Sequence, residues 1–208
     1  MDNDASRKGT AFMKVISLVS GGLDSTVMAQ LIHEEGHEQI PLFVDYGQIN
    51  LESEKRACLA NFLRLSLPTP KTISLPEYGA FFSSGLTDRA KRIVEDAFLP
   101  GRNLLFLLLA AALAYEESAD SIAVGFLDES LSLFPDQRRD FADNAEVILS
   151  QVMRRPLKVL TPLISLGKAE VLAIARERGI SNTYSCHAGA AIPCGNCIAC
   201  MEYKGLEI

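Results

Sequence analysis

The sequence predicts an α/β fold, a doubly wound parallel sheet of about five strands with helices on both faces, followed by a small metal-binding segment. Three observations support this prediction. Short apolar runs alternate with stretches of helical periodicity, as in successive βαβ units. The chain has 208 residues, of which 48% are apolar, so it can bury one substantial core. Four of its five cysteines lie close to the C-terminus.

The first part of the chain alternates strand and helix. The run KVISLV at 14–19 is apolar, which predicts a buried strand. From Asp24, apolar residues recur at helical spacing until Gly36, so a helix is expected between these two residues. The same patterns predict a strand at 40–46, a helix across 52–65 and a third strand at 71–75.

The second part continues the alternation after an interruption. Residues 76–100 contain glycines, serines and mixed charge, as either an active-site loop or an ordinary surface insertion would. Asn103 is a favourable N-cap for an apolar helix over 104–117, which we expect to be buried all round. The patterns then predict a strand at 121–126, a helix over 135–153, an extended segment with a short strand at 158–163, and a last helix over 167–179.

Composition divides the chain into a polar tail at 1–12, an α/β domain at 13–180 and a cysteine-rich segment at 181–208. The tail has no apolar core, so we expect disorder rather than a signal peptide, with Met13 as an alternative start. The longest apolar run is shorter than the roughly 20 residues of a membrane-spanning helix. A net charge of −6 argues against direct nucleic-acid binding. We therefore expect a cytoplasmic protein with no membrane partner.

The most informative stretch is SLVSGGLDST, where the first strand turns into a helix. Adjacent glycines let a backbone approach a ligand closely, and the free amides of a helix N-terminus attract phosphate. Neither the GxxxxGK loop of P-loop proteins nor the GxGxxG fingerprint is present. We expect a phosphate cradle of another kind, made by Ser20, Gly21, Gly22, Leu23, Asp24, Ser25 and Thr26.

The C-terminal cysteines have the spacing CxxxxxxxCxxCxxC. Thiolates three residues apart can converge on one ion, which predicts a closed, structural Zn²⁺ site. The expected ligands are Cys186, Cys194, Cys197 and Cys200. An iron–sulfur cluster is the rival, although the usual fourth cysteine of that motif would fall near Lys204 and is missing. His187 could replace the first cysteine as a ligand, and Cys58 is expected in the core.

The sequence SGGLDS between a strand and a helix resembles the pyrophosphate loop of the ATP pyrophosphatase superfamily, whose fold is of the adenine-nucleotide alpha-hydrolase type. The resemblance implies that the loop holds the β- and γ-phosphates of ATP and that Asp24 helps to position Mg²⁺. Pyrophosphate is then the leaving group, and the nucleophile becomes adenylated at the α-phosphorus.

Five further stretches carry a closer resemblance: YGQ at 46–48, LPGRNLLF at 99–106, FPDQRRDF at 134–141, PLISLGKAE at 162–170, and the terminal cysteines. Together they resemble the QueC family of 7-cyano-7-deazaguanine synthases. That resemblance implies an ATP-dependent C–N ligase that adenylates the carboxylate of 7-carboxy-7-deazaguanine and passes it to ammonia, giving an amide and then a nitrile. It also implies a structural zinc and a homodimer. The implied further ATP contacts are Arg102, Asn103 and Lys168, and the implied catalytic residues are Asp24, Arg102 and Lys168.

The chain departs from the family pattern near the second substrate. The family's YxQRH reads YGQIN at 46–50, and the acid that usually follows falls on Ser53, which two glutamates flank. The family's DxSGYPDCR reads SLSLFPDQR at 130–138, without its first acid, its glycine and its cysteine. The Leu-Arg pair after the last cysteine is Glu202 and Tyr203.

The resemblance still implies a substrate site, made by Tyr46, Gln48, Asp128, Phe134, Asp136 and Arg138. Asp136 is expected to accept hydrogen bonds from ring N–H groups, and Arg138 to pair with the carboxylate of the acid. Solvated surface charge is the alternative for these two residues.

The departures indicate a divergent member and leave open which amine accepts the activated acid. One alternative is a QueC-like enzyme of a bacterial antiviral system, which joins the deazaguanine to the amine of a partner protein. An RNA-thiolating enzyme of the same superfamily is disfavoured, because four cysteines are committed to metal. A nucleotide sensor that binds ATP without turnover is the remaining alternative, which release of pyrophosphate would exclude.

Overall fold

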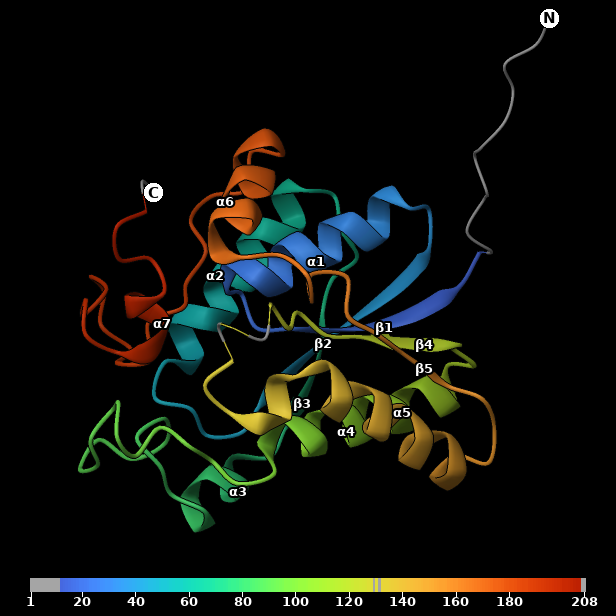
Figure 1. The fold of residues 1–208 in the computed structure, drawn as a ribbon, viewed down its shortest axis with the longest axis horizontal. Helices are drawn as coiled ribbons and strands as arrows, with labels where there is room; N and C mark the ends of the chain where they lie inside the picture. Colours follow the sequence, from blue (N-terminus) through green and yellow to red (C-terminus); the bar gives the residue numbers. More distant parts are fainter. Residues whose placement is uncertain (1–11, 129, 131, 207–208) are drawn as a thin grey trace, which may run out of the picture.

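Figure 1 shows the fold in a computed structural model, which describes residues 12–128, 130 and 132–206. Five parallel strands form one sheet in the order β3-β2-β1-β4-β5. They are β1 (Lys14–Val19), β2 (Glu38–Asp45), β3 (Lys71–Ser74), β4 (Ser121–Ala123) and β5 (Lys158–Leu160). The predicted fold class is confirmed, whereas the tail expected at 1–12 lies almost wholly outside the described residues.

Helices cover both faces of the sheet (Figure 1). One face carries α1 (Leu23–Glu34), α2 (Leu51–Arg64) and α6 (Lys168–Glu177), and the other carries α4 (Arg102–Glu116) and α5 (Arg139–Val152). Three short helices are α3 (Pro76–Phe81), η2 (Pro135–Gln137) and α7 (Ile198–Met201). Within the described residues, no helix has the length and apolar character needed to cross a bilayer.

Each face of the sheet has its own core, because side chains alternate along a strand. On β1, Val15 and Val19 join the cluster beneath α1, α2 and α6, while Ile16 and Leu18 join the cluster beneath α4 and α5. A strand that is buried on both faces needs apolar residues at successive positions, which is the pattern of KVISLV.

The order of the strands reverses between β1 and β4. From β1 the chain continues to β2 on one side, and it returns as β4 on the other. In open α/β sheets, ligands bind beyond the carboxyl ends of the strands at such a reversal. The loop at 20–22 follows β1 and the segment at 124–126 follows β4, so the fold brings the predicted phosphate cradle to this position.

Helix α4 differs from its prediction in two respects. It begins at Arg102 with Gly101 as its N-cap, at φ 74°, so Asn103 lies in the first turn and is not the cap. It packs on the sheet through one side only, and Leu108 and Tyr115 are 41% and 57% exposed. The expectation of burial all round is wrong because an apolar sequence does not specify on how many sides a helix has neighbours.

Other boundaries also shift. The loop expected at 76–100 begins with α3, and the helix predicted over 135–153 is broken at Arg138, whose backbone is extended (φ −94°, ψ 165°). The C-terminal segment contains α7 and a small apolar cluster of its own, formed by Cys186, Cys197 and Ala199. The proposed boundary at 180 between this segment and the α/β domain stays a prediction.

Candidate active site

A cavity of about 280 Å³ lies beyond the carboxyl ends of β1 and β4. Its walls come from separate parts of the chain: the loop after β1, the end of β2 with the first turn of α2, the N-terminal ends of α4 and α6, and the C-terminal segment. Pockets at the reversal point of an α/β sheet are the usual ligand sites of such folds. The cavity is therefore the candidate active site.

The glycine-rich loop forms one wall of this cavity. Of the seven predicted cradle residues, four line it: Ser20, Gly22, Asp24 and Ser25. The hydroxyl oxygens of Ser20 and Ser25 lie 3.1 Å apart, and the N–H of Gly22 donates to Oγ of Ser20 at 3.3 Å. Because α1 begins at Leu23, the unpaired N–H groups of a helix N-terminus lie at the same place. Hydroxyls and amides thus converge as a phosphate group requires.

The other three cradle residues shape the loop. Gly21 has φ 83°, and a Cβ at this position would lie 2.2 Å from the backbone oxygen of Glu54, so only glycine fits. Leu23 packs into the core beneath α1. The hydroxyl of Thr26 donates to the carbonyl of Gly22 at 2.8 Å and so closes the first turn.

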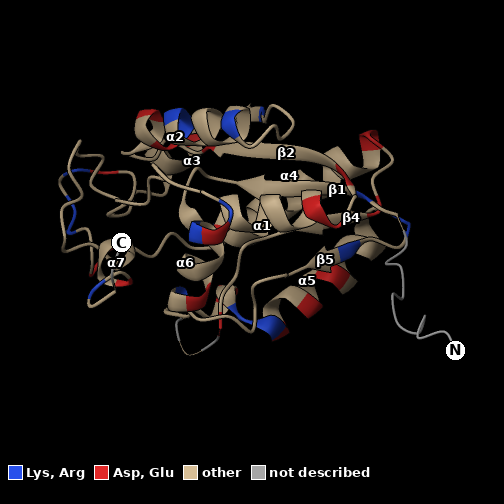
Figure 2. Cartoon of the chain, turned by 90° about the horizontal axis from the view of Figure 1, so that it is seen from above, with Lys and Arg blue, Asp and Glu red and all other residues tan. Residues whose placement is uncertain are grey.

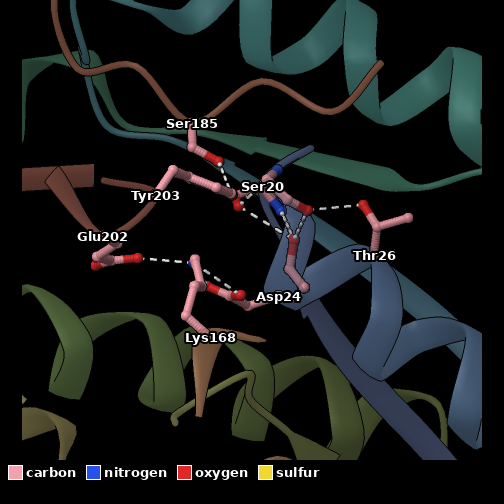
Figure 3. A network of polar contacts seen from close by, with 9 residues as sticks. Ser20, Asp24, Thr26, Lys168, Ser185, Glu202 and Tyr203 are labelled. Atoms are coloured by element: carbon pink, nitrogen blue, oxygen red, sulfur yellow. Dashed lines mark hydrogen bonds and ion pairs between the residues drawn. The ribbon is translucent and has the colours of Figure 1, made fainter. Parts of the chain in front are cut away.

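Lys168 links the loop to the C-terminal segment (Figure 3). Its Nζ lies 2.8 and 2.9 Å from the carboxylate oxygens of Asp24, and 2.7 Å from Oε2 of Glu202. It also lies 4.8 Å from the centre of the Tyr203 ring. Burial alone would lower the pKa of Lys168, but the charges of Asp24, Tyr203 and Glu202 raise it above its usual range. Lys168 is therefore a fixed positive charge beside the loop.

Arg102 supplies a second cation from the first turn of α4. Its guanidinium carbon lies 5.8 Å from the ring centre of Tyr46 and 5.9 Å from that of Phe106, which holds the side chain against the cavity wall. The neighbouring Asn103 also lines the cavity, and its Nδ2 donates to the backbone carbonyl of Asp136 at 3.0 Å. The fold thus brings both predicted cations to the cavity that the loop lines.

Glu54, which was not predicted as a site residue, also lines the cavity. Its Oε2 accepts a hydrogen bond from Gln48 at 3.2 Å, and its Oε1 accepts one from Asn50 at 3.0 Å. Burial raises the pKa of Glu54 to about 7, against the opposing effect of these amides. In sequence, the only signal was the family's acid one position earlier, at Ser53.

A second cavity of about 100 Å³ adjoins the first. The residues that line both are Arg102, Gln137, His187 and Glu202. Burial, with the charge of Arg102 as a smaller cause, lowers the pKa of His187 to about 4, so its imidazole is neutral at pH 7. Gln137 and His187 belong to motifs noted in the sequence, but neither was predicted to face the ligand.

The six predicted substrate residues are not all brought together. Tyr46 and Gln48 line the larger cavity, and Phe134 lines the smaller one. The three that line neither cavity are Asp128, Asp136 and Arg138. Asp128 accepts hydrogen bonds from the N–H and the hydroxyl of Ser130 at 2.9 and 2.6 Å. A substrate role for these three residues stays a prediction.

The four predicted metal ligands do come together. The Sγ atoms of Cys186, Cys194, Cys197 and Cys200 all lie within 4.8 Å of one another. Four Zn–S bonds of about 2.3 Å in a tetrahedron place the sulfurs about 3.8 Å apart, so the group fits such an ion. Backbone N–H groups of His187 and Cys194 donate to sulfurs of this group at 3.4 and 3.3 Å. The imidazole of His187 is not part of the group.

Comparison with known proteins gives the relationship of this chain. A family model described as "Queuosine biosynthesis protein QueC" matches residues 14–206. The chain belongs to the QueC family. The 7-cyano-7-deazaguanine synthase of a Nitratiruptor species is 33% identical over 94% of each chain, and that of Campylobacter curvus is 30% identical over 93% of each. The prediction of a divergent QueC-like enzyme is confirmed at the level of the family.

Solved structures agree on the fold. NMN synthetase from Francisella tularensis has a TM-score of 0.57 at 18% identity, over 86% of this QueC-family chain and 68% of its own. The U34-tRNA thiolase NcsA from Methanococcus maripaludis has a TM-score of 0.51 at 16% identity, over 96% of this chain and 67% of its own. Identities this low show a shared architecture and nothing about substrate.

Proposed function

We propose that this QueC-family chain is an ATP-dependent, AMP- and pyrophosphate-forming ligase that adenylates the carboxylate of 7-carboxy-7-deazaguanine. The observation that carries the proposal is the convergence of the loop, Arg102 and Lys168 on one cavity at the reversal point of the sheet. The curated relatives, which match over nearly their whole length, are named for the product of that substrate.

In the first step, a carboxylate oxygen of the acid attacks the α-phosphorus of ATP, and the bond to the β-phosphate breaks. The hydroxyls and amides of the loop hold the β- and γ-phosphates, while Arg102 and Lys168 offset the charge that develops on the leaving pyrophosphate. Asp24 and Glu202 offer the hard oxygen ligands that suit Mg²⁺, and we assign Asp24 to hold it. When bound, this ion supplies further positive charge to the phosphates.

In the second step, ammonia attacks the acyl carbon, AMP leaves, and loss of a proton gives the amide. The oxygen of the amide then attacks a second ATP and releases a second pyrophosphate. Loss of AMP and of the two protons on the amide nitrogen then gives the nitrile, 7-cyano-7-deazaguanine.

A protein amine in place of ammonia is the second candidate, and one observation favours it. The segment 130–138, which departs from the family pattern, lines the second cavity through Leu133, Phe134 and Gln137. A different amine would enter through the part of this cavity whose residues depart from the family pattern. In that case the chain would act with a partner protein, as in QueC-like antiviral systems.

Mass spectrometry of the products formed from ATP and 7-carboxy-7-deazaguanine tests the proposal. Nitrile or amide that appears only when ammonia is added supports the first candidate. Pyrophosphate and AMP without either product, together with a mass increase on a supplied protein, support the second. If the acid does not stimulate pyrophosphate release at all, the proposed substrate is wrong.

We propose Zn²⁺ for the cysteine cluster, in a structural role, because four thiolates close the coordination sphere. Cys58, the fifth cysteine, is 1% exposed and lies in the core. Burial raises the pKa of its thiol to about 12, so it is a poor carrier of sulfur for RNA thiolation. Clustered thiols are preserved in a reducing compartment, which supports a cytoplasmic location.

We also propose a homodimer. Between its terminal residues, α4 carries no charged side chain, and its outer side exposes Leu104, Leu108 and Tyr115. Helices α2 and α5, in contrast, carry several charged residues (Figure 2). The adjacent α5 exposes Val147 and Val152. Exposed apolar side chains on two neighbouring helices are compatible with a copy of the same surface. Size-exclusion chromatography with light scattering measures the state, and a monomer at micromolar concentration contradicts the proposal.

A further inference from the structure

Three carboxylates line the larger cavity, and one of them stands apart. Asp24 and Glu202 both pair with Lys168. Glu54 has no ion-pair partner among the described residues, and its only hydrogen bonds from side chains come from the amides of Gln48 and Asn50. The charge of Arg102, which lines the same cavity, lowers the pKa of Glu54 less than the two amides do, and no cation contacts the carboxylate directly, so it keeps acceptor sites for a ligand.

The two amides that hold Glu54 have no donors left for a ligand. Nε2 of Gln48 donates to Glu54 and to the carbonyl of Val44, and its Oε1 accepts from the N–H of Tyr46. Nδ2 of Asn50 donates to Glu54 and to the carbonyl of Cys186. An amide nitrogen has two N–H groups, so both are fully used. These contacts fix the carboxylate and leave its remaining acceptor sites to the ligand.

Two departures from the family motif lie in contact at this site. Asn50 stands where the family has histidine, and Glu54 supplies its carboxylate one residue after the family's acid. The two side chains are hydrogen-bonded to each other at 3.0 Å, so Asn50 orients the carboxylate of Glu54. Burial raises the pKa of Glu54 to about 7, so the donors of the protein do not fully compensate the ionised form.

The ligand that suits such a carboxylate presents two adjacent N–H donors. A 2-amino-6-oxo ring offers its ring N1–H and its C2 amino group side by side, and these can donate to the two oxygens of one carboxylate. Adenine offers one donor beside one acceptor, which an ionised carboxylate does not match. We propose that Glu54 recognises the 2-amino-6-oxo edge of the deazaguanine and so determines specificity for it. This inference rests on the proposed function.

The test compares 7-carboxy-7-deazaguanine with its analogue that lacks the 2-amino group, in pyrophosphate release at saturating ATP. The wild-type protein should prefer the 2-amino acid by about 30-fold in kcat/KM, within the range that a bidentate contact to a base provides. Glu54→Gln should reduce this preference to less than about 3-fold, while the KM for ATP stays within a factor of about two. Glu52→Gln, at an exposed position in the same turn of α2, is the matched control and should behave as wild type.

Three results would overturn the proposal. They are a wild-type protein that accepts both acids equally, a Glu54→Gln variant that keeps the wild-type preference, and a variant whose only defect is a higher KM for ATP. The first result requires no variant, so it stands even if Glu54→Gln folds poorly. If the wild-type protein activates neither acid, the proposed function fails, and this inference fails with it.

Discussion

Replacing Lys168 by methionine tests how the charges of the site are balanced. Lys168 is 6% exposed, and its Nζ contacts the carboxylates of both Asp24 and Glu202. Methionine keeps most of the volume but leaves two like charges without a cation. Two such charges about 5 Å apart repel by about 3 kcal/mol at an effective dielectric constant of about 20.

Water screens part of this repulsion, since Asp24 and Glu202 are 26% and 32% exposed. We therefore expect Lys168→Met to lower the free energy of unfolding by about 2 kcal/mol in urea titrations. Adding Glu202→Gln to that variant removes one of the two like charges and should restore about 1 kcal/mol. Asp24→Asn alone keeps the pair of Lys168 with Glu202, so it should cost about 1 kcal/mol or less.

Activity should follow a different order. Lys168→Met and Asp24→Asn should each lower the rate of pyrophosphate release by about 100-fold or more, because both act where charge develops. Glu202→Gln should not rescue the rate of Lys168→Met, since it restores stability and not the cation. A double variant less stable than Lys168→Met would refute the repulsion argument. Near-normal turnover of Asp24→Asn would refute the assignment of the loop.

Gly21→Ala should destabilise the protein by about 2 kcal/mol more than Gly36→Ala, because both glycines have positive φ but only Gly21 has backbone within 3 Å of the new Cβ; equal losses in urea would contradict the close approach. Cys197→Ser should remove one zinc per chain by elemental analysis while Cys58→Ala keeps it, and visible absorbance would indicate an iron–sulfur cluster instead. Burial raises the pKa of Glu54 from 4.5 to about 7, so the folded protein binds the proton of this carboxyl group more tightly than the unfolded chain does. The free energy of unfolding therefore falls by up to about 3 kcal/mol as the pH rises from about 5 to about 8. Relative to wild type, Glu54→Gln should therefore gain stability between about pH 5 and pH 8, and a constant difference in urea midpoints would contradict the raised pKa.

The fold could be predicted because its determinants are local. Strand β1 is buried on both faces and has an apolar sequence, and α1 follows it after a short loop that contains two glycines. The cysteine cluster could also be predicted from the sequence, because cysteines at this regular spacing can converge on one ion. The N-cap of α4 could not be predicted, because Gly101 and Asn103 are both acceptable N-cap residues. The path of the preceding loop decides between them.

The ligand-facing residues divide in the same way. Asp24, Arg102 and Lys168 lie in recognisable motifs, so the sequence singled them out, and all three line the cavity; their roles stay predictions. Whether Glu54 points into the cavity depends on which side of α2 faces it. A shift of one residue along a helix turns the side chain by about 100°, so the sequence did not predict its place. The contact of Glu202 with Lys168 depends on how the C-terminal segment packs against α6, and no local sequence pattern predicts that packing.

The C-terminal segment connects the cysteine cluster to the walls of the larger cavity. The N–H of Tyr184 donates to the carbonyl of Gly21 at 2.9 Å, and the carbonyl of Cys186 accepts from Asn50, which in turn holds Glu54. Glu202 reaches Lys168 from the C-terminal end of α7, the helix that contains Cys200. The loop, the carboxylate at 54 and the lysine of α6 are thus each tied to a segment whose own apolar cluster is small. A metal bound by its four cysteines would supply folding energy to such a segment. We therefore expect the proposed zinc to position three walls of the cavity, so that its removal with a chelator weakens ATP binding and base recognition together.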